Sequence, residues 1–354
     1  NTIVKHLQAA GTKFGAKVSA PTSASAMSRN LMDKDMDKVV GACKNGKPDI
    51  VFFFISRGSA KTAYKKGKRY MQRKGITSQF FTSYNPVRDN EKPSKFMNLL
   101  SQMIVKMGGS VWEVELDMPD TMIAGADVYH GPRNQSVASL VTQWGKNFTE
   151  FFSMPKIQKR GLELMHNMAS MVLDSIKQYK KQTNKVPKQF IFFRDGVGEG
   201  QIDAVQKCEV ARIRDTLDKE YKEQAPKLLF IVVTKRLSDR FAVLTEDGLS
   251  NPNGGVVVLD NVVKNGRANF FLVAQRVTQG TATPTHYEVI YDDTGMKLNQ
   301  IIDMAYQFTF GYSNWMGPVK VPAPVQYAHK QAALIGVTQD DVVNAGLLKT
   351  RHYM

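Results

Sequence analysis

The chain has 354 residues, 42% of them hydrophobic and 23% charged, which is the composition of a globular protein with a substantial core. Its formal net charge of +16 favours a polyanionic partner, most often a nucleic acid, with a generally basic soluble protein as the alternative. The two cysteines exclude a disulfide framework and favour a reducing compartment, and no apolar run reaches the ~18 residues of a membrane span. Because the first residue is not Met, the chain is expected to be a fragment or a processed product.

The first predicted elements form a small alternating unit. Residues 19–38 are expected to form a loop and a short helix. The pattern then predicts, in chain order, a strand at 50–55, a basic helix at 59–74, a short strand at 79–81 and a helix at 94–106. The strand at 50–55 is a continuous apolar run, as in a sheet that is buried on both faces. This alternation predicts a small doubly wound domain.

A longer, strand-rich region starts near Val111. Strands are predicted at 122–128, 137–142, 189–193, 227–234, 254–262, 269–277 and 286–291, and helices at 160–181, 201–220, 296–310 and 326–335. The order suits a mixed RNase H-like sheet. The sequence therefore predicts an α/β protein with a leading segment at 1–48, a Rossmann-like domain at 49–118 and an RNase H-like domain at 119–354.

Two acids that follow apolar strands are the main catalytic candidates. Asp195 ends the run 190–193 and begins a glycine-rich turn, and Asp127 ends the run 122–126. Acids on neighbouring strands repel each other unless a cation lies between them, and paired Mg²⁺ ions would also activate water for phosphodiester hydrolysis. A turn-forming role for Asp195 is the alternative, whereas a dinucleotide-binding turn would need a G-x-G-x-x-G spacing that Gly200 does not meet.

Four segments resemble motifs of the Argonaute/PIWI family: GADVYH at 125–130, RDGVGEGQ at 194–201, TATPTHY at 281–287 and VPAPVQYAHK at 321–330. The resemblance covers about residues 49–354 and implies a Rossmann-like MID domain followed by an RNase H-like PIWI domain. It also implies a metal-binding catalytic tetrad made of Asp127, Glu163, Asp195 and His329, with Mg²⁺ or Mn²⁺ as the cofactor.

Glu163 has a second interpretation, since a glutamate in the first turn of the predicted helix 160–181 would be stabilised by the helix dipole alone. Three further histidines are weaker candidates. His130 is expected to pack or hydrogen-bond beside the site, His166 to lie on a helix face, and His286 to support a turn.

The basic stretch 61–74 is the candidate nucleic-acid anchor, because half of its residues are Lys or Arg and none is acidic. A solvated helix face is the alternative. The resemblance implies a pocket for the 5′-phosphate of a guide strand, formed by Tyr64, Lys68, Gln79, Gln102 and Lys106. Gln102, where other Argonautes carry Lys, favours the PIWI clade and a metal-assisted pocket. Loop 56–61 is expected to choose the first base, and the ending 352–354 to fold back towards the pocket.

The resemblance further implies that Lys235, Arg236 and Arg240 line the guide channel. It predicts guided cleavage of RNA in gene or transposon silencing. The partners would be a small guide RNA with a 5′-phosphate (piRNA-like), a complementary target RNA and silencing proteins, but no membrane. Two alternatives stay open, namely a guide-binding silencing module with little cleavage and an unguided RNase H-like nuclease. The family's N-terminal and PAZ domains have no counterpart in the sequence.

Overall fold

The computed structural model describes residues 2–25, 27, 31, 33–56, 58, 60–83, 92–131, 135–263 and 266–354. The described chain divides into two compact units, one made of residues 1–111 and 337–354, the other of residues 112–336. We describe each unit by itself. No described helix combines the length and the apolar character that crossing a membrane would require.

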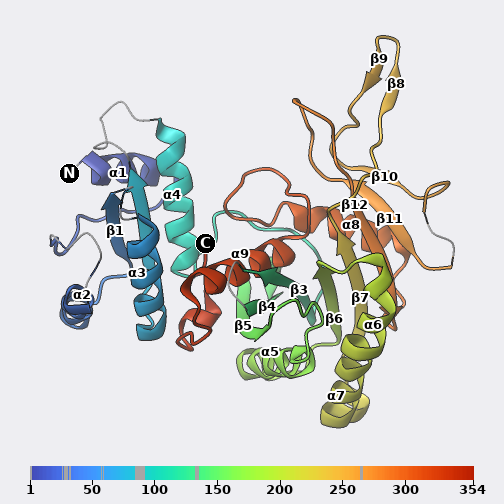
Figure 1. The fold of residues 1–354 in the computed structure, drawn as a ribbon, viewed down its shortest axis with the longest axis horizontal. Coiled ribbons are helices and arrows are strands. Elements are labelled where there is room, and N and C mark those ends of the chain that lie inside the picture. Colours follow the sequence, from blue (N-terminus) through green and yellow to red (C-terminus); the bar gives the residue numbers. More distant parts are fainter. Residues whose placement is uncertain are drawn as a thin grey trace. The chain divides into compact units, whose positions relative to one another are not determined.

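The first unit is built around two parallel strands with helices on both faces (Figure 1). Strand β1 (Val51–Ser56) pairs with β2 (Ser78–Ser83), and α3 (Ala60–Lys74) connects them. Leu7 on α1 (Thr2–Phe14) and Phe96 on α4 (Pro93–Lys106) pack with Phe81 on one face. On the other face, Met36 on α2 (Asp33–Gly46) and Met71 on α3 share a core. The predicted doubly wound arrangement is confirmed.

The last residues of the chain belong to this first unit. The carboxylate of Asp340 accepts a hydrogen bond from Arg69 Nε (3.0 Å) and pairs with Arg73, and its carbonyl accepts one from Gln72 Nε2 (3.1 Å). All three partners lie on α3. The compact units therefore differ from the predicted ranges, because contacts distant in sequence bring 337–354 to α3 and because α1 packs on α4 instead of forming a separate leader.

The second unit contains a mixed sheet of eight strands within the described residues, in the order β10-β11-β12-β7-β6-β3-β4-β5. The central strands β3 (Thr121–His130), β6 (Gln189–Asp195) and β7 (Lys227–Thr234) run parallel to one another. Antiparallel neighbours complete the sheet: β4 (Gln135–Trp144), β5 (Glu150–Lys159), β10 (Val256–Val258), β11 (Asn269–Val273) and β12 (Thr285–Asp292). The predicted RNase H-like mixed sheet is confirmed.

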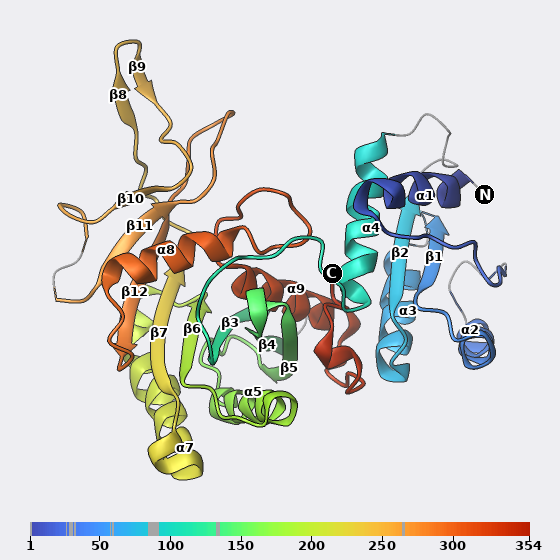
Figure 2. The ribbon, with the colours of Figure 1, turned by 180° about the vertical axis from the view of Figure 1, so that it is seen from behind.

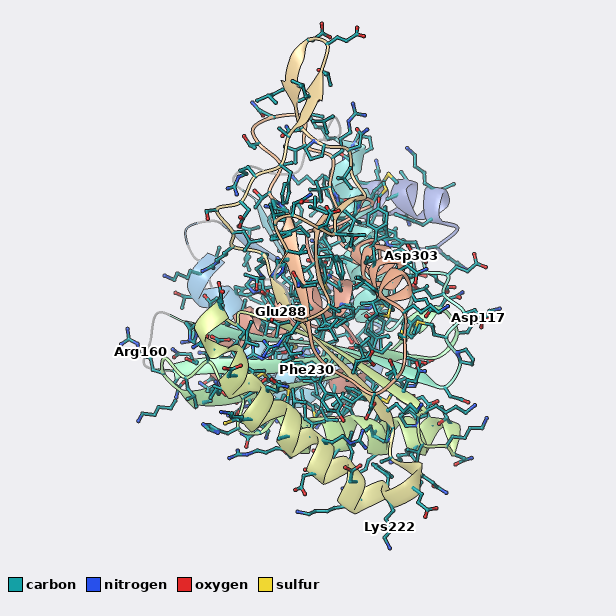
Figure 3. The ribbon with its side chains drawn as sticks, turned by 90° about the vertical axis from the view of Figure 1, so that its right-hand side faces the viewer. Asp117, Arg160, Lys222, Phe230, Glu288 and Asp303 are labelled. Atoms are coloured by element: carbon teal, nitrogen blue, oxygen red, sulfur yellow. The ribbon has the colours of Figure 1, made fainter. Side chains whose placement is uncertain are left out.

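Alternate side chains of the central strands pack on opposite faces of this sheet, as the two-residue period of a strand requires. Phe192 and Phe230 join the core under α5 (Met168–Thr183) and α7 (Ala211–Tyr221). Ile191 and Phe193 join the core under α8 (Leu298–Thr309) and α9 (Ala323–Thr338). Figures 1 and 2 show these helices on the two sides of the sheet, and in Figure 3 the labelled Phe230 lies inside these layers.

Several local predictions need correction, among them the strand predicted at 269–277, which ends at Val273, and α1 and β5, which were not predicted. The predicted helix 160–181 begins only at Met168, and residues 160–167 form a loop and turns. The predicted strand 254–262 is shortened to β10. The predicted helix 201–220 is interrupted by a π-helical turn at Gln206–Val210 between α6 (Ile202–Val205) and α7. The exposed hairpin of β8 (Val243–Thr245) and β9 (Gly248–Ser250), prominent in Figures 1 and 2, was not expected.

Candidate catalytic site and anion pocket

Asp127 and Asp195 lie side by side on neighbouring parallel strands. The register pairs Ala126 of β3 with Arg194 of β6, so that the next residue on each strand is an aspartate. Both aspartates are buried, with exposed fractions of 5% and 2%. By the alternation of each strand, both lie on the face covered by α8 and α9. The two strand-end acids thus converge as the sequence predicts.

Helix α9 brings His329 to this pair because Gly125 allows a close approach of two backbones. A Cβ at Gly125 would lie 2.2 Å from the backbone of Pro324, so no larger residue fits between β3 and the start of α9. One turn further along the helix, His329 Nδ1 lies 2.7 Å from Oδ2 of Asp127. The family motif at 125–130 and the family motif at 321–330 are therefore in direct contact.

Glu163 reaches the same place from the loop before α5. A Cβ placed on Gly196 would lie 2.9 Å from Oε1 of Glu163 and 3.6 Å from Oδ1 of Asp127, so both oxygens border this glycine. Gly196 also has a positive φ of 88°, a conformation that glycine adopts without strain. Its amide donates to Oδ1 of Asp195 (2.8 Å). The predicted tetrad of Asp127, Glu163, Asp195 and His329 is thus assembled around one turn.

Arg194 holds the Glu163 loop in place. It points to the opposite face from Asp195, is fully buried, and its Nε donates to Oε2 of Glu209 (3.1 Å). Its Nη1 donates to Oε1 of Glu163 (3.1 Å) and its Nη2 to the Glu163 carbonyl (2.6 Å). Glu209, in the π-helical turn, also accepts the amide of Met165 (2.7 Å). His130 Nε2 lies 2.8 Å from Oε2 of Glu163.

The acids of the site experience opposing effects. Burial alone would raise the pKa of Asp127, but the hydrogen bond to His329 and the charges of Lys235 and Arg194 outweigh it and hold the pKa below 3.8. For Asp195, burial is the largest effect and raises the pKa. The charge of Lys235 opposes this rise, and the charge of Asp127 adds to it. The ammonium group of Lys235 forms an ion pair with Oδ2 of Asp195.

Three carboxylates and an imidazole form a donor set that suits Mg²⁺ or Mn²⁺. Their present arrangement is pairwise, because Glu163 is bonded to Arg194 and His130, Asp195 to Lys235, and Asp127 to His329. Accordingly, no group of three or more His, Cys, Asp or Glu side chains in the described chain is arranged to hold a metal ion. The residue types of the tetrad suit a divalent cation. In this structure, the positive charge beside Asp195 comes from Lys235, and that beside Glu163 comes from Arg194.

The predicted anion pocket in the first unit contains two buried lysines. Lys68 and Lys106 are 4% and 1% exposed, and their side chains are close enough to influence each other's pKa. Lys106 Nζ donates to Oε1 of Gln79 (2.7 Å), and Nε2 of Gln79 donates to Oε1 of Gln102 (3.2 Å). Burial and mutual repulsion lower the pKa of Lys106, and burial lowers that of Lys68 to about 8. Three of the five predicted pocket residues, Gln79, Gln102 and Lys106, therefore form one hydrogen-bonded network, and the pKa of Lys106 is also lowered by the charge of Lys68.

Tyr64, the fifth predicted pocket residue, lies one turn before Lys68 on α3 and packs edge-on against Phe80, with ring centroids 5.3 Å apart. Of the loop 56–61, Arg57 and Ser59 lie outside the described residues.

The three predicted guide-channel residues follow β7 and differ in their surroundings. Lys235 is paired with Asp195, as described above, and Arg236 is exposed. Arg240 is exposed as well and donates to the carbonyls of Leu237 (2.8 Å) and Asp239 (2.6 Å). Their guide-channel role stays a prediction.

Two expectations for histidines were wrong. His166 lies in the turn before α5 and not on a helix face. His286 lies within β12, where Nε2 is 3.1 Å from Oδ1 of Asn269, so it does not support a turn. The role of Glu209 was missed altogether. A sequence signal existed, because an isolated glutamate among apolar helix positions indicates a buried charge that needs a partner.

Comparison with known proteins places these features in a family. The Piwi domain model matches residues 50–339. The chain is 35% identical to the Piwi-like protein Ago3 of Bombyx mori over 263 residues, which are 74% of this chain and 28% of that protein. It is 38% identical to Piwi-like protein 1 of Gallus gallus over 237 residues, 66% of this chain and 27% of that protein. The chain thus spans less than a third of the length of these relatives.

Solved structures agree in fold. The crystal structure of Drosophila Piwi matches with a TM-score of 0.88 at 24% identity, over 100% of this chain and 48% of that one. The structure of Kluyveromyces polysporus Argonaute with a guide RNA matches with a TM-score of 0.85 at 20% identity, over 99% of this chain and 48% of that one. At these identities the likeness shows the fold alone, whereas the Piwi domain match covers most of the sequence. The chain therefore belongs to the Argonaute/PIWI family, in its PIWI clade.

Proposed function

We propose that the chain binds a small RNA guide by its 5′-phosphate and cleaves complementary RNA, in piRNA-like silencing of genes or transposons. The observation that carries the proposal is the assembly of Asp127, Glu163, Asp195 and His329 around Gly196 in the second unit. Base pairing between guide and target would supply sequence specificity, while the protein would bind backbone and shape.

In this proposal the four tetrad side chains hold Mg²⁺ or Mn²⁺. Bound metal would supply the chemistry that activates a water molecule and stabilises the leaving oxygen of the target. Asp127 and Asp195 contribute buried carboxylates, and His329 contributes an imidazole fixed by its contact with Asp127. Glu163 is positioned by Arg194, so the third carboxylate of the tetrad is supplied by the loop before α5.

The first unit would hold the guide's 5′ end. Lys68 and Lys106 are buried cations that form no ion pair with a carboxylate among the described residues, and such a pair favours a bound anion. Gln79 and Gln102 extend this network with amide groups that would contact the phosphate or a metal ion bound to it. Tyr64 would stack on the first base. Lys235, Arg236 and Arg240 would contact the guide backbone.

A guide-binding silencing module with little cleavage, acting through recruited proteins, is the second candidate. The pairing of Asp195 with Lys235 and of Glu163 with Arg194 favours it, because both carboxylates are already neutralised without a metal.

Cleavage by the chain loaded with a 5′-phosphorylated guide RNA distinguishes the candidates. We expect a complementary labelled target to be cut at one position in Mg²⁺ or Mn²⁺ and left intact in EDTA. Asp195→Ala should abolish cleavage while retaining guide binding. The matched control Asp247→Ala changes an exposed aspartate at the β8–β9 turn and should cut like the wild type.

Guide and target binding without cleavage by the wild type would favour the silencing module. Cleavage that needs no guide would favour the unguided nuclease, and cleavage retained by Asp195→Ala would contradict the tetrad.

A further inference from the structure

His352 lies beside the buried lysine pair, in the ending that was expected to fold back towards the pocket, but it is not among the five predicted pocket residues. It belongs to the C-terminal segment that packs in the first unit, and it is 5% exposed. Its own carbonyl oxygen lies 3.4 Å from Nζ of Lys68, which also donates to the carbonyl of Ser78 (2.9 Å). The imidazole is close enough to Lys68 and Lys106 to be repelled by both charges.

The tautomer of His352 follows from its hydrogen bond. Nδ1 lies 2.9 Å from the carbonyl oxygen of Leu347. A carbonyl only accepts, so Nδ1 must carry the proton. Burial, followed by repulsion from Lys68, lowers the pKa of His352 to about 3. The ring is therefore neutral, and Nε2 carries a lone pair.

That lone pair has no partner. Nε2 of His352 is a buried nitrogen without a hydrogen-bond partner among the described residues. The charged groups that face the ring are Lys68 from α3 and Lys106 from α4, and on its own segment Arg351 donates from Nη2 to the carbonyl of Gly109 (2.5 Å). Within the described residues, the two charges known to shift the pKa of His352 are both positive. A buried acceptor left unpaired is unfavourable, and a proton shared with a bound ligand would satisfy it.

We propose that His352 Nε2 directly contacts the phosphomonoester bound by Lys68 and Lys106, through a single proton that is taken up from solvent on binding. The inference rests on the proposed guide-binding function and names one further residue of that pocket. Both Nε2 and a phosphate oxygen are acceptors, so they repel each other unless one proton lies between them. With that proton they form a charge-assisted hydrogen bond, and no other bond is made or broken. Because the second pKa of a phosphomonoester is about 6, this proton is absent from the free ligand at neutral pH.

The test uses the full chain with ¹⁵N-labelled histidine and one short single-stranded RNA carrying either a 5′-phosphate or a 5′-hydroxyl. The Nε2 resonance of His352 should move from the unprotonated to the protonated or hydrogen-bonded range with the phosphorylated RNA only. His352→Gln identifies the resonance by its loss. His166→Gln, which changes an exposed histidine, is the matched control and should leave that resonance and the affinity unchanged.

Affinity supplies the second measurement. Any proton uptake by the lysine pair is common to all variants, so the difference between variants is the informative quantity. Between about pH 6 and about pH 8, the affinity for the phosphorylated RNA should fall as the pH rises. For each pH unit, the factor by which the affinity falls should be about ten times larger for the wild type than for His352→Gln. An unchanged Nε2 resonance together with equal pH slopes, at a retained preference for the 5′-phosphate, would overturn the role of His352 alone. Equal binding of the two RNAs by the wild type would overturn the pocket, and with it this inference.

Discussion

Each acid of the proposed catalytic site is paired with a basic side chain, Glu163 with Arg194, Asp195 with Lys235 and Asp127 with His329. Asp195 is 2% exposed and lies beside Asp127, so its charge needs a nearby cation. Lys235 provides that cation from the residue that follows β7. Since a divalent ion would take the same oxygen, Lys235 and the metal compete for Asp195. Lys235, predicted to line a guide channel, therefore also acts directly on a proposed catalytic carboxylate.

Replacing Lys235 by Met should make the fold depend on metal. Without the cation, Asp195 and Asp127 repel each other, and we expect a loss of about 2 kcal/mol of unfolding free energy in EDTA. Mn²⁺ should restore more stability to Lys235→Met than it adds to the wild type, because the metal no longer competes with an ammonium group. Thermal unfolding during a Mn²⁺ titration measures this difference. Arg240→Met, which removes an exposed cation bonded only to carbonyls in the described chain, is the control. An equal gain in the wild type and Lys235→Met would contradict the competition.

The Glu163 loop is the element whose structure depends most on distant contacts. Its Met165 amide is bonded to Glu209, and its Glu163 carbonyl to Arg194. We expect Glu209→Gln, which keeps the shape but removes the charge from buried Arg194, to destabilise the loop by about 1–3 kcal/mol. Amide exchange across residues 160–167 should then rise by about tenfold or more. Glu220→Gln, an exposed change on α7, should leave the exchange unchanged. Unaltered exchange in Glu209→Gln would show that the loop is held by other contacts.

The same loop shows where prediction from the sequence ends. The strands that carry Asp127 and Asp195 were predictable, since each acid follows an uninterrupted apolar run. Leu164, Met165 and Met168 continue the apolar spacing of α5, so local periodicity extends the helix across residues that are in fact a loop. Contacts of the loop with Glu209, 44 residues away, override that periodicity. Likewise, nothing local to Asp340 indicates its pairing with Arg69, 271 residues away.

At the scale of the whole molecule, two kinds of positive charge must be distinguished. The net charge of +16 resides largely on exposed Lys and Arg, which attract any RNA backbone. Lys68 and Lys106 are different, because both are buried, with Lys68 bonded to the carbonyl of Ser78 and Lys106 to the side chain of Gln79. Salt screens exposed charges strongly and buried ones much less. General attraction and recognition of a 5′-phosphate should therefore separate in a salt titration.

We expect affinity for a 5′-hydroxyl RNA to fall with salt, with a log–log slope of about −0.7 for each backbone phosphate that is neutralised. The ratio of affinities for 5′-phosphate and 5′-hydroxyl RNA should change much less over the same range, because that difference arises at the buried lysines. Lys106→Met should reduce this affinity ratio to about one and leave the salt dependence of 5′-hydroxyl RNA binding unchanged. Lys219→Met, which removes an exposed lysine on α7, should leave the ratio unchanged. Fluorescence anisotropy across a salt series measures both quantities. If the affinity ratio fell with salt as steeply as the total affinity, the 5′-phosphate would be bound at the exposed surface, where salt screens charges, and not between Lys68 and Lys106.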